Sequence, residues 1–177
     1  MNCRTSDETR EADCSDAIEE ISPSDGPKRC GACNSRGTRV SRKTILLMLK
    51  PHMLERAAGG SYSFCPQPTC SIVYFEDDGD EQFTVDELRL RVGLKVKDDP
   101  IPLCYCFGFD EKDLRDEIKR MGDTIIPSVV SRLIREGLCS CESRNPAGAC
   151  CLGELNTAAK RLKLENAMTS RPLGRLN

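Results

Sequence analysis

The sequence contains no tryptophan, five phenylalanines and a single histidine among its 177 residues. Hydrophobic residues make up 38% of the chain, so apolar burial alone would build only a modest core. No run of about 18 apolar residues occurs, which argues against a membrane-spanning helix. Catalytic patterns are also missing, because the chain has no Ser-His-Asp arrangement, no phosphate-cradling glycine loop and no HExxH motif. The sequence therefore shows no hydrolytic or group-transfer site.

Strong charge and an export signal are absent as well. The formal net charge is −2, too near zero to indicate nucleic acid as the main partner. The first residues, "MNCRTSDETREADCSDAIEE", are acidic and polar, with no apolar run after a basic start. We therefore expect no signal peptide and a cytoplasmic protein, in which thiols stay reduced.

Cysteine is what the chain has in abundance, with 12 residues. In a chain with a small apolar core, disulfides or metals usually supply the missing stability. Clustered thiols in a reducing compartment favour metal binding. A disulfide framework remains the alternative if a signal segment has been removed.

The two ends of the chain differ in composition from the rest. Residues 1–27 are rich in Ser, Asp and Glu and predict a disordered acidic arm. Cys3 and Cys14 in this arm have no close thiol neighbours, so we expect them to be unpaired. Residues 157–177 carry five Lys or Arg against one Glu and predict a basic helix end and tail. Such a tail is either a solvated helix end or a docking segment for an acidic partner.

Residues 28–99 predict a mixed α and β unit. The stretch "TILLMLKP" (44–51) predicts a short helix capped by its threonine and closed by its proline. The β-branched and aromatic run at 71–75 predicts a strand, and "EQFTV" (81–85) is suited to return antiparallel to it. "TVDE" at 84–87 matches a capping box, so a helical turn should precede a further strand at 89–96.

Residues 100–156 predict a small helical unit with cysteine loops between three helices. Each helix has an apolar stripe and a plausible start, such as a cap or a proline in the first turn. The first helix is capped by Asp110, the second covers 124–137, and the third starts near Leu152. Their apolar stripes are, in the same order, Leu114, Ile118 and Met121; Val130, Leu133 and Ile134; and Leu155, Ala159 and Leu162. The fold class is therefore α+β.

Two closely spaced cysteine pairs lie in the first unit, "CGAC" at 30–33 and "CPQPTC" at 65–70. Zinc takes four ligands in a tetrahedron, and each short loop can supply two sulfur atoms. The small or turn-forming residues that such loops need are Gly31, Asn34 and Gly37. The pattern predicts a structural zinc site in a ribbon-like module, with ligands Cys30, Cys33, Cys65 and Cys70.

Two other interpretations of the first cluster remain. "CGAC" resembles a thioredoxin-like redox pair in spacing, although no βαβ pattern surrounds it. His52 is the alternative zinc ligand, although a lone histidine after a helix-ending proline is usually a surface residue.

The second unit holds six further cysteines: Cys104, Cys106, Cys139, Cys141, Cys150 and Cys151. Six thiols exceed the need of one zinc ion, whereas a [2Fe–2S] cluster takes four thiolates. The "FGFD" turn and the helix start after it should point free N–H groups at such a cluster. The first cysteine pair can then face one iron and two thiols of the later loop the other. A second zinc site or buried structural thiols are the alternatives.

These motifs resemble a known family. "CYCFGF" followed by "CxCExxNPxGxCCLG" is similar to the N-terminal domain of CopZ-like copper chaperones, and more broadly to the iron–sulfur module of bacterioferritin-associated ferredoxin. In that family a four-cysteine zinc module precedes a helical [2Fe–2S] domain. The resemblance covers about residues 28–156, with both modules in the same order, and it implies a zinc module at 28–99 and a [2Fe–2S]-binding domain at 100–156.

The resemblance also implies a ligand set and a function. It matches Cys104 and Cys106 to one half of the iron–sulfur site and points to Cys141 and Cys151 for the other half. Cys139 and Cys150 are then neighbouring or substitute thiols. The implied activity is one-electron transfer in copper or heavy-metal handling, including reduction of Cu(II) to Cu(I).

The chain departs from the family in one respect, because it has no Met-x-Cys-x-x-Cys copper loop. We therefore expect a redox or metal-transfer protein as partner, such as a copper-carrying domain on another chain. The alternative function is a thiol-rich metallochaperone or metal sensor that binds soft ions directly.

Overall fold

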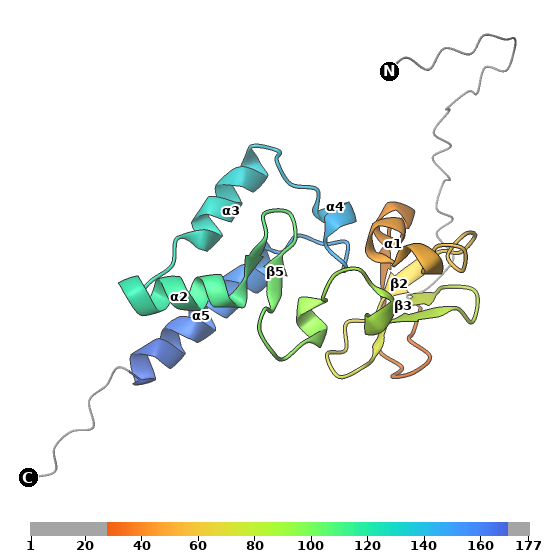
Figure 1. Cartoon of the computed structure of the whole chain (residues 1–177), viewed down its shortest axis with the longest axis horizontal. Coiled ribbons are helices and arrows are strands. Elements are labelled where there is room, and N and C mark those ends of the chain that lie inside the picture. Colours follow the sequence, from red (N-terminus) through yellow and green to blue (C-terminus); the bar gives the residue numbers. More distant parts are fainter. Residues whose placement is uncertain (1–27, 170–177) are drawn as a thin grey trace, which may run out of the picture.

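The computed structural model describes residues 28–169, and the predicted arm at 1–27 and the end of the tail, with Cys3 and Cys14, lie outside this range. A small sheet and a group of helices lie side by side (Figure 1). The strands are β1 (Thr38–Val40), β2 (Tyr62–Phe64), β3 (Ile72–Glu76), β4 (Gln82–Thr84), β5 (Pro102–Cys104) and β6 (Phe109–Asp110). The helices are α1 (Arg42–Met48), α2 (Glu111–Met121), α3 (Ile126–Arg135), α4 (Cys141–Arg144) and α5 (Leu152–Thr169). Short 3-10 helices are η1 (Pro51–Met53), η2 (Val85–Glu87) and η3 (Gly93–Lys95).

The first unit is a four-stranded antiparallel sheet in the order β1-β2-β3-β4. Residues Ile72–Phe75 of β3 are all buried, because different side chains of the strand enter two clusters. Tyr74 lies in the main core with α1, whereas Ile72 and Phe75 pack beside the first four cysteines. The α+β class predicted from the sequence is confirmed.

The second unit is built from α2, α3 and α5, with the β5–β6 hairpin at its edge (Figure 1). Leu114 and Ile118 of α2, Val130 of α3 and Leu155 of α5 form its buried centre. Asp110 caps α2 as predicted, accepting a 3.0 Å hydrogen bond from the backbone N–H of Asp113. In the described range, no helix is both long and apolar enough to cross a membrane.

Several local predictions require correction. Helix α1 begins at Arg42 with Ser41 as its cap, so Thr44 lies inside the helix. The strand expected at 89–96 is wrong, because this stretch holds the 3-10 helix η3 and bends instead. Met121 ends α2 with 51% of its surface exposed and does not join the stripe. By contrast, the capping box at 84–87 is confirmed and opens η2.

The short helix α4 belongs to the second unit in sequence but packs against α1 of the first (Figure 1). Ala147, which follows α4, packs on the core of the sheet. The cysteine loop of the second unit therefore lies on the surface of the first unit.

Candidate metal centres

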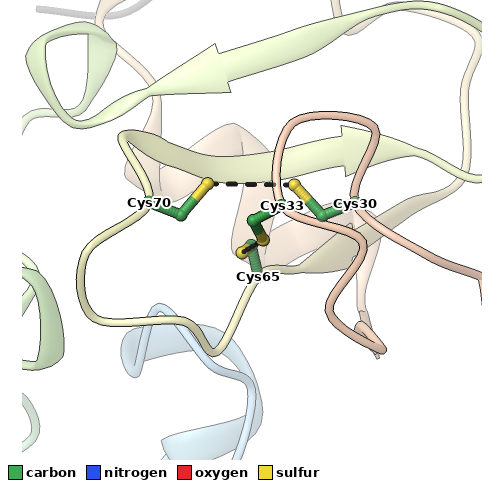
Figure 2. Close-up of side chains that lie close together, drawn as sticks. All are labelled: Cys30, Cys33, Cys65 and Cys70. Carbon is green, nitrogen blue, oxygen red and sulfur yellow. Dashed lines mark hydrogen bonds between the residues drawn. The ribbon is translucent and has the colours of Figure 1, made fainter.

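Two loops of the sheet bring four cysteines together (Figure 2). Cys30 and Cys33 lie in the loop before β1, and Cys65 and Cys70 bound the loop between β2 and β3. The Sγ atoms of Cys30 and Cys70 are 3.9 Å apart, and those of Cys33 and Cys65 are 3.5 Å apart. All four sulfur atoms lie within 4.8 Å of one another.

This spacing fits a tetrahedral zinc ion. With Zn–S bonds of about 2.3 Å, the sulfur atoms of a tetrathiolate site are about 3.8 Å apart. Cys30 and Cys65 are buried and the other two cysteines are partly buried, so the donors are shielded from bulk water. A zinc ion held by four thiolates would have no position open for substrate, which is the arrangement typical of structural zinc sites.

The first cysteine loop is shaped by backbone hydrogen bonds and small residues. The N–H of Cys30 donates to the carbonyl oxygen of Ser35 at 3.0 Å, and the N–H of Asn34 donates back to the carbonyl of Cys30 at 2.8 Å. Asn34 has a φ of 59°, a left-handed conformation that asparagine tolerates better than most residues. A side chain at Gly37 would begin 2.4 Å from the ring of Phe75. The loop can therefore close tightly against the sheet.

The protein environment already favours ionisation of one thiol in this group. Hydrogen bonds from the side chain and backbone of Ser35 lower the pKa of Cys33 to about 6. Burial raises the pKa of Cys65 to about 12, so this thiol ionises readily only when a metal replaces its proton.

Lys95 is a charged neighbour of the zinc site that the sequence analysis missed. Its ammonium nitrogen donates hydrogen bonds to the carbonyl oxygens of Gln67 and Cys70, at 2.9 and 3.3 Å. The same nitrogen lies 5.7 Å from the ring centroid of Phe64. A zinc ion with four thiolates carries a net charge of −2, which a nearby cation stabilises. Since Lys95 lay in a predicted strand, its approach to the cysteine loop had no sequence signal.

The second cluster brings two cysteine segments together in crossed pairs. The Sγ of Cys151 is 3.1 Å from that of Cys104, and the Sγ of Cys106 is 3.7 Å from that of Cys141. Each close pair thus takes one thiol from the β5 region and one from the later loop. This pairing differs from the sequence-based prediction, in which the first two thiols face one iron and two thiols of the later loop face the other.

Backbone N–H groups of the β5–β6 turn and of Ser140, which precedes α4, face the second cluster. The N–H of Ser140 donates to the Sγ of Cys106 at 3.4 Å. The thiol of Cys151 and the N–H groups of Phe107 and Cys106 together lower the pKa of Cys104 to about 6. The shared hydrogen bond with Cys104, together with burial, raises the pKa of Cys151. Cys104 is therefore the thiolate-favouring member of its pair, and it lies beside N–H donors.

The second cluster is wider than the first. In the described part of the chain, only the first four cysteines lie close enough together to bind a single ion jointly. Two close pairs that are set farther apart suit a group with two metal atoms better than one zinc ion. Cys104 and Cys151 are each 1% exposed and Cys141 is 7% exposed, so the donors would hold such a group away from water.

The remaining predicted thiols lie outside these close pairs. Cys139 is partly buried and Cys150 is exposed. His52 lies exposed on η1 and is not among the residues that gather at the first cluster.

Three comparisons with known proteins agree with this geometry. Residues 27–89 match the family profile zf_CopZ, described as a zinc binding domain. The chain is 30% identical over 147 residues to the copper chaperone CopZ of Archaeoglobus fulgidus, an alignment that covers 77% of this chain and 69% of the relative. The X-ray structure of the Archaeoglobus fulgidus CopZ N-terminal domain is similar, with a TM-score of 0.61 and 30% identity over 73% of this chain and 95% of that chain.

Proposed function

This chain is a zinc-binding member of the CopZ N-terminal domain family, and from that premise we propose that its second cysteine cluster holds a [2Fe–2S] centre for one-electron transfer in copper handling. The observation that carries the proposal is the pair of close thiol contacts, Cys104 with Cys151 and Cys106 with Cys141. A binuclear centre needs two thiolates for each iron, and the two pairs supply that number.

The proposed ligands are held by this chain in a way that suits an anionic cluster. When bound, a [2Fe–2S] group would accept or donate one electron, at a potential set by hydrogen bonds, charge and solvent exposure. The N–H groups of Cys106, Phe107 and Ser140 face the sulfur atoms, and such donors stabilise negative charge on thiolates. Burial of Cys104 and Cys151 keeps water from the ligands.

The proposal of copper handling is based on the relative from Archaeoglobus fulgidus, which is named a copper chaperone. We propose Cu(II) as the electron acceptor and Cu(I) as the product, with an upstream protein supplying each electron. In this proposal, a protein that carries copper then receives the Cu(I). The zinc module is a scaffold in this proposal, since its four thiols are already used.

An anaerobic metal analysis and spectrum test the proposal directly. About two irons and one zinc per chain are expected, with visible sulfur-to-iron bands and a one-electron EPR signal after reduction. A colourless protein that holds zinc alone after anaerobic reconstitution would refute it. The exposed thiol of Cys150 and the partly buried thiol of Cys139 would then favour direct binding of soft metal ions.

A further inference from the structure

We propose that the zinc-bearing sheet sets the position of the later cysteine loop, with Tyr74 and Thr44 as positioning residues for Cys141. The inference rests on the proposed function in that the loop supplies half of the second metal centre. It assigns to two side chains of the first unit a role in the metal centre of the second.

Tyr74 makes the first of two buried contacts. It lies on β3 with no exposed surface, and its hydroxyl donates a 2.8 Å hydrogen bond to the carbonyl oxygen of Pro146. Pro146 is also fully buried and lies in the turn between Cys141 and Cys151. A buried hydroxyl and a buried carbonyl both need a partner, so the contact fixes the turn against the sheet.

Thr44 makes the second contact from helix α1. Its Oγ1 donates to the carbonyl oxygen of Glu142 at 2.6 Å, and Thr44 has no exposed surface. Ser41 at the start of the same helix also reaches that carbonyl, at 3.5 Å. Glu142 directly follows Cys141, so the bonded carbonyl is one residue from the proposed ligand.

The later cysteine loop is also closed on itself by the side chain of Asn145. The side chain of Asn145 accepts from the N–H of Ala147 at 3.0 Å and donates to the carbonyl of Ala149 at 2.7 Å. Gly148 has a φ of 64°, and a Cβ at this position would lie 3.3 Å from Val40 of β1. Because the loop is hydrogen-bonded both internally and to the first unit, we expect loss of either contact to shift Cys141.

The other cysteine segment of the second cluster, with Cys104 and Cys106, is hydrogen-bonded to the linker that follows the sheet. Tyr105, between Cys104 and Cys106, accepts a 2.8 Å hydrogen bond from the N–H of Gly93 and donates to the carbonyl of Arg91 at 3.2 Å. A small movement of the loop relative to this anchored half changes the 3.7 Å separation between Cys106 and Cys141.

The test compares Tyr74→Phe with the matched control Tyr62→Phe in the full-length protein. Tyr62 is also buried in the sheet core, but its hydroxyl donates to the carbonyl of Arg56, within the first unit. In zinc-loaded protein without iron, alkylation of Cys141 should be about fivefold faster in Tyr74→Phe than in wild type, as expected for loss of one buried hydrogen bond. Tyr62→Phe should match wild type, and the exposed Cys150 should react at one rate in all three proteins.

A second pair of variants separates positioning from general stability. Thr44→Val removes the hydroxyl and should accelerate alkylation of Cys141, whereas Thr44→Ser keeps the hydroxyl and should restore the wild-type rate. After reconstitution, the visible circular dichroism of the cluster should change in Tyr74→Phe and Thr44→Val, and not in the two controls. Zinc content should remain one per chain throughout.

Equal alkylation rates and identical spectra in all variants would overturn the inference while leaving the proposed function intact. If no cluster can be reconstituted but the alkylation rates still differ as expected, the proposed function fails and the positioning of Cys141 stands. The thiol measurement requires no iron, so the two proposals are judged separately.

Discussion

The ammonium group of Lys95 lies 3.3 Å from the carbonyl oxygen of Cys70, at the edge of the zinc site. The lysine belongs to η3, which connects the sheet to the second unit, and it also binds the carbonyl of Gln67 at 2.9 Å. One side chain thus orders the second cysteine loop and brings positive charge towards a tetrathiolate. No catalytic role is needed to explain its placement.

Replacement of Lys95 by methionine should weaken zinc binding about tenfold, because groups next to a metal site typically contribute that much to affinity. The matched control is Lys97→Met, which removes the same charge from an exposed position two residues away. Competition with a chromophoric chelator measures both affinities. If both variants bound zinc equally and more weakly than wild type, Lys95 would act through general charge alone.

Removal of zinc should unfold the sheet, because metal-binding energy in a small site is folding energy. Hydrogen exchange after chelation should accelerate throughout β1–β4 and also in α4, which packs on α1. Helix α3 serves as the internal control, since it packs against α5 in the second unit. Unchanged circular dichroism and exchange in zinc-free protein would show that the apolar core suffices.

Glu87 should stabilise the sheet in a pH-dependent manner. Burial opposes ionisation of Glu87, but hydrogen bonds from Thr84 and Arg56 outweigh it and hold the pKa of the carboxyl below its ordinary value of 4.5. A depressed folded-state pKa gives stability that is complete above the unfolded pKa and is lost as the pH falls through the folded pKa. Glu87→Gln should therefore lower the free energy of unfolding by about 1–2 kcal/mol at neutral pH.

Urea unfolding of wild type, Glu87→Gln and the exposed control Glu55→Gln measures this effect. The gap between wild type and Glu87→Gln should stay constant from pH 7.5 down to about pH 5 and then close at lower pH. Zinc loss in acid affects all three proteins alike, so the difference isolates the carboxyl. A gap that persists unchanged at pH 3.5 would contradict the ionic origin.

The spare thiols should be dispensable for the proposed iron–sulfur centre. The double variant Cys139→Ser/Cys150→Ser should keep about two irons per chain and transfer electrons to Cu(II) at the wild-type rate. Cys104→Ser should lose the cluster, because this buried thiol forms the shorter of the two close pairs. Loss of copper handling in the double variant, with the iron retained, would instead favour direct metal binding by the spare thiols.

Sequence signals predicted well those features that depend on neighbouring residues. The capping box at 84–87, the Asp110 cap and the antiparallel pairing of the strands expected at 71–75 and 81–85 each follow from side chains within a few residues of one another. The first four cysteines also gather as predicted, since each short loop supplies two ligands from one backbone turn. The zinc site and the membership of the CopZ N-terminal domain family could therefore both be predicted from local motifs.

Features that depend on tertiary contacts were missed. Nothing near "RLRVGLKV" indicates that Lys95 meets the cysteine loop, and the β-branched residues favoured a strand there. The crossed pairing of Cys104 with Cys151 depends on how the later loop sits on the sheet. Sequence spacing shows which thiols share a segment, but it does not determine which thiol of one segment contacts which thiol of the other.

The packing of the later cysteine loop on the first unit has a consequence for the order in which the two units fold during protein synthesis. All four zinc ligands lie before residue 71, whereas the second cluster needs Cys151, which leaves the ribosome 81 residues after Cys70. Domains generally fold in N-to-C order as they emerge. The sheet can thus form with its zinc while the helices are still being translated, and the nascent later loop then meets a surface that is already folded.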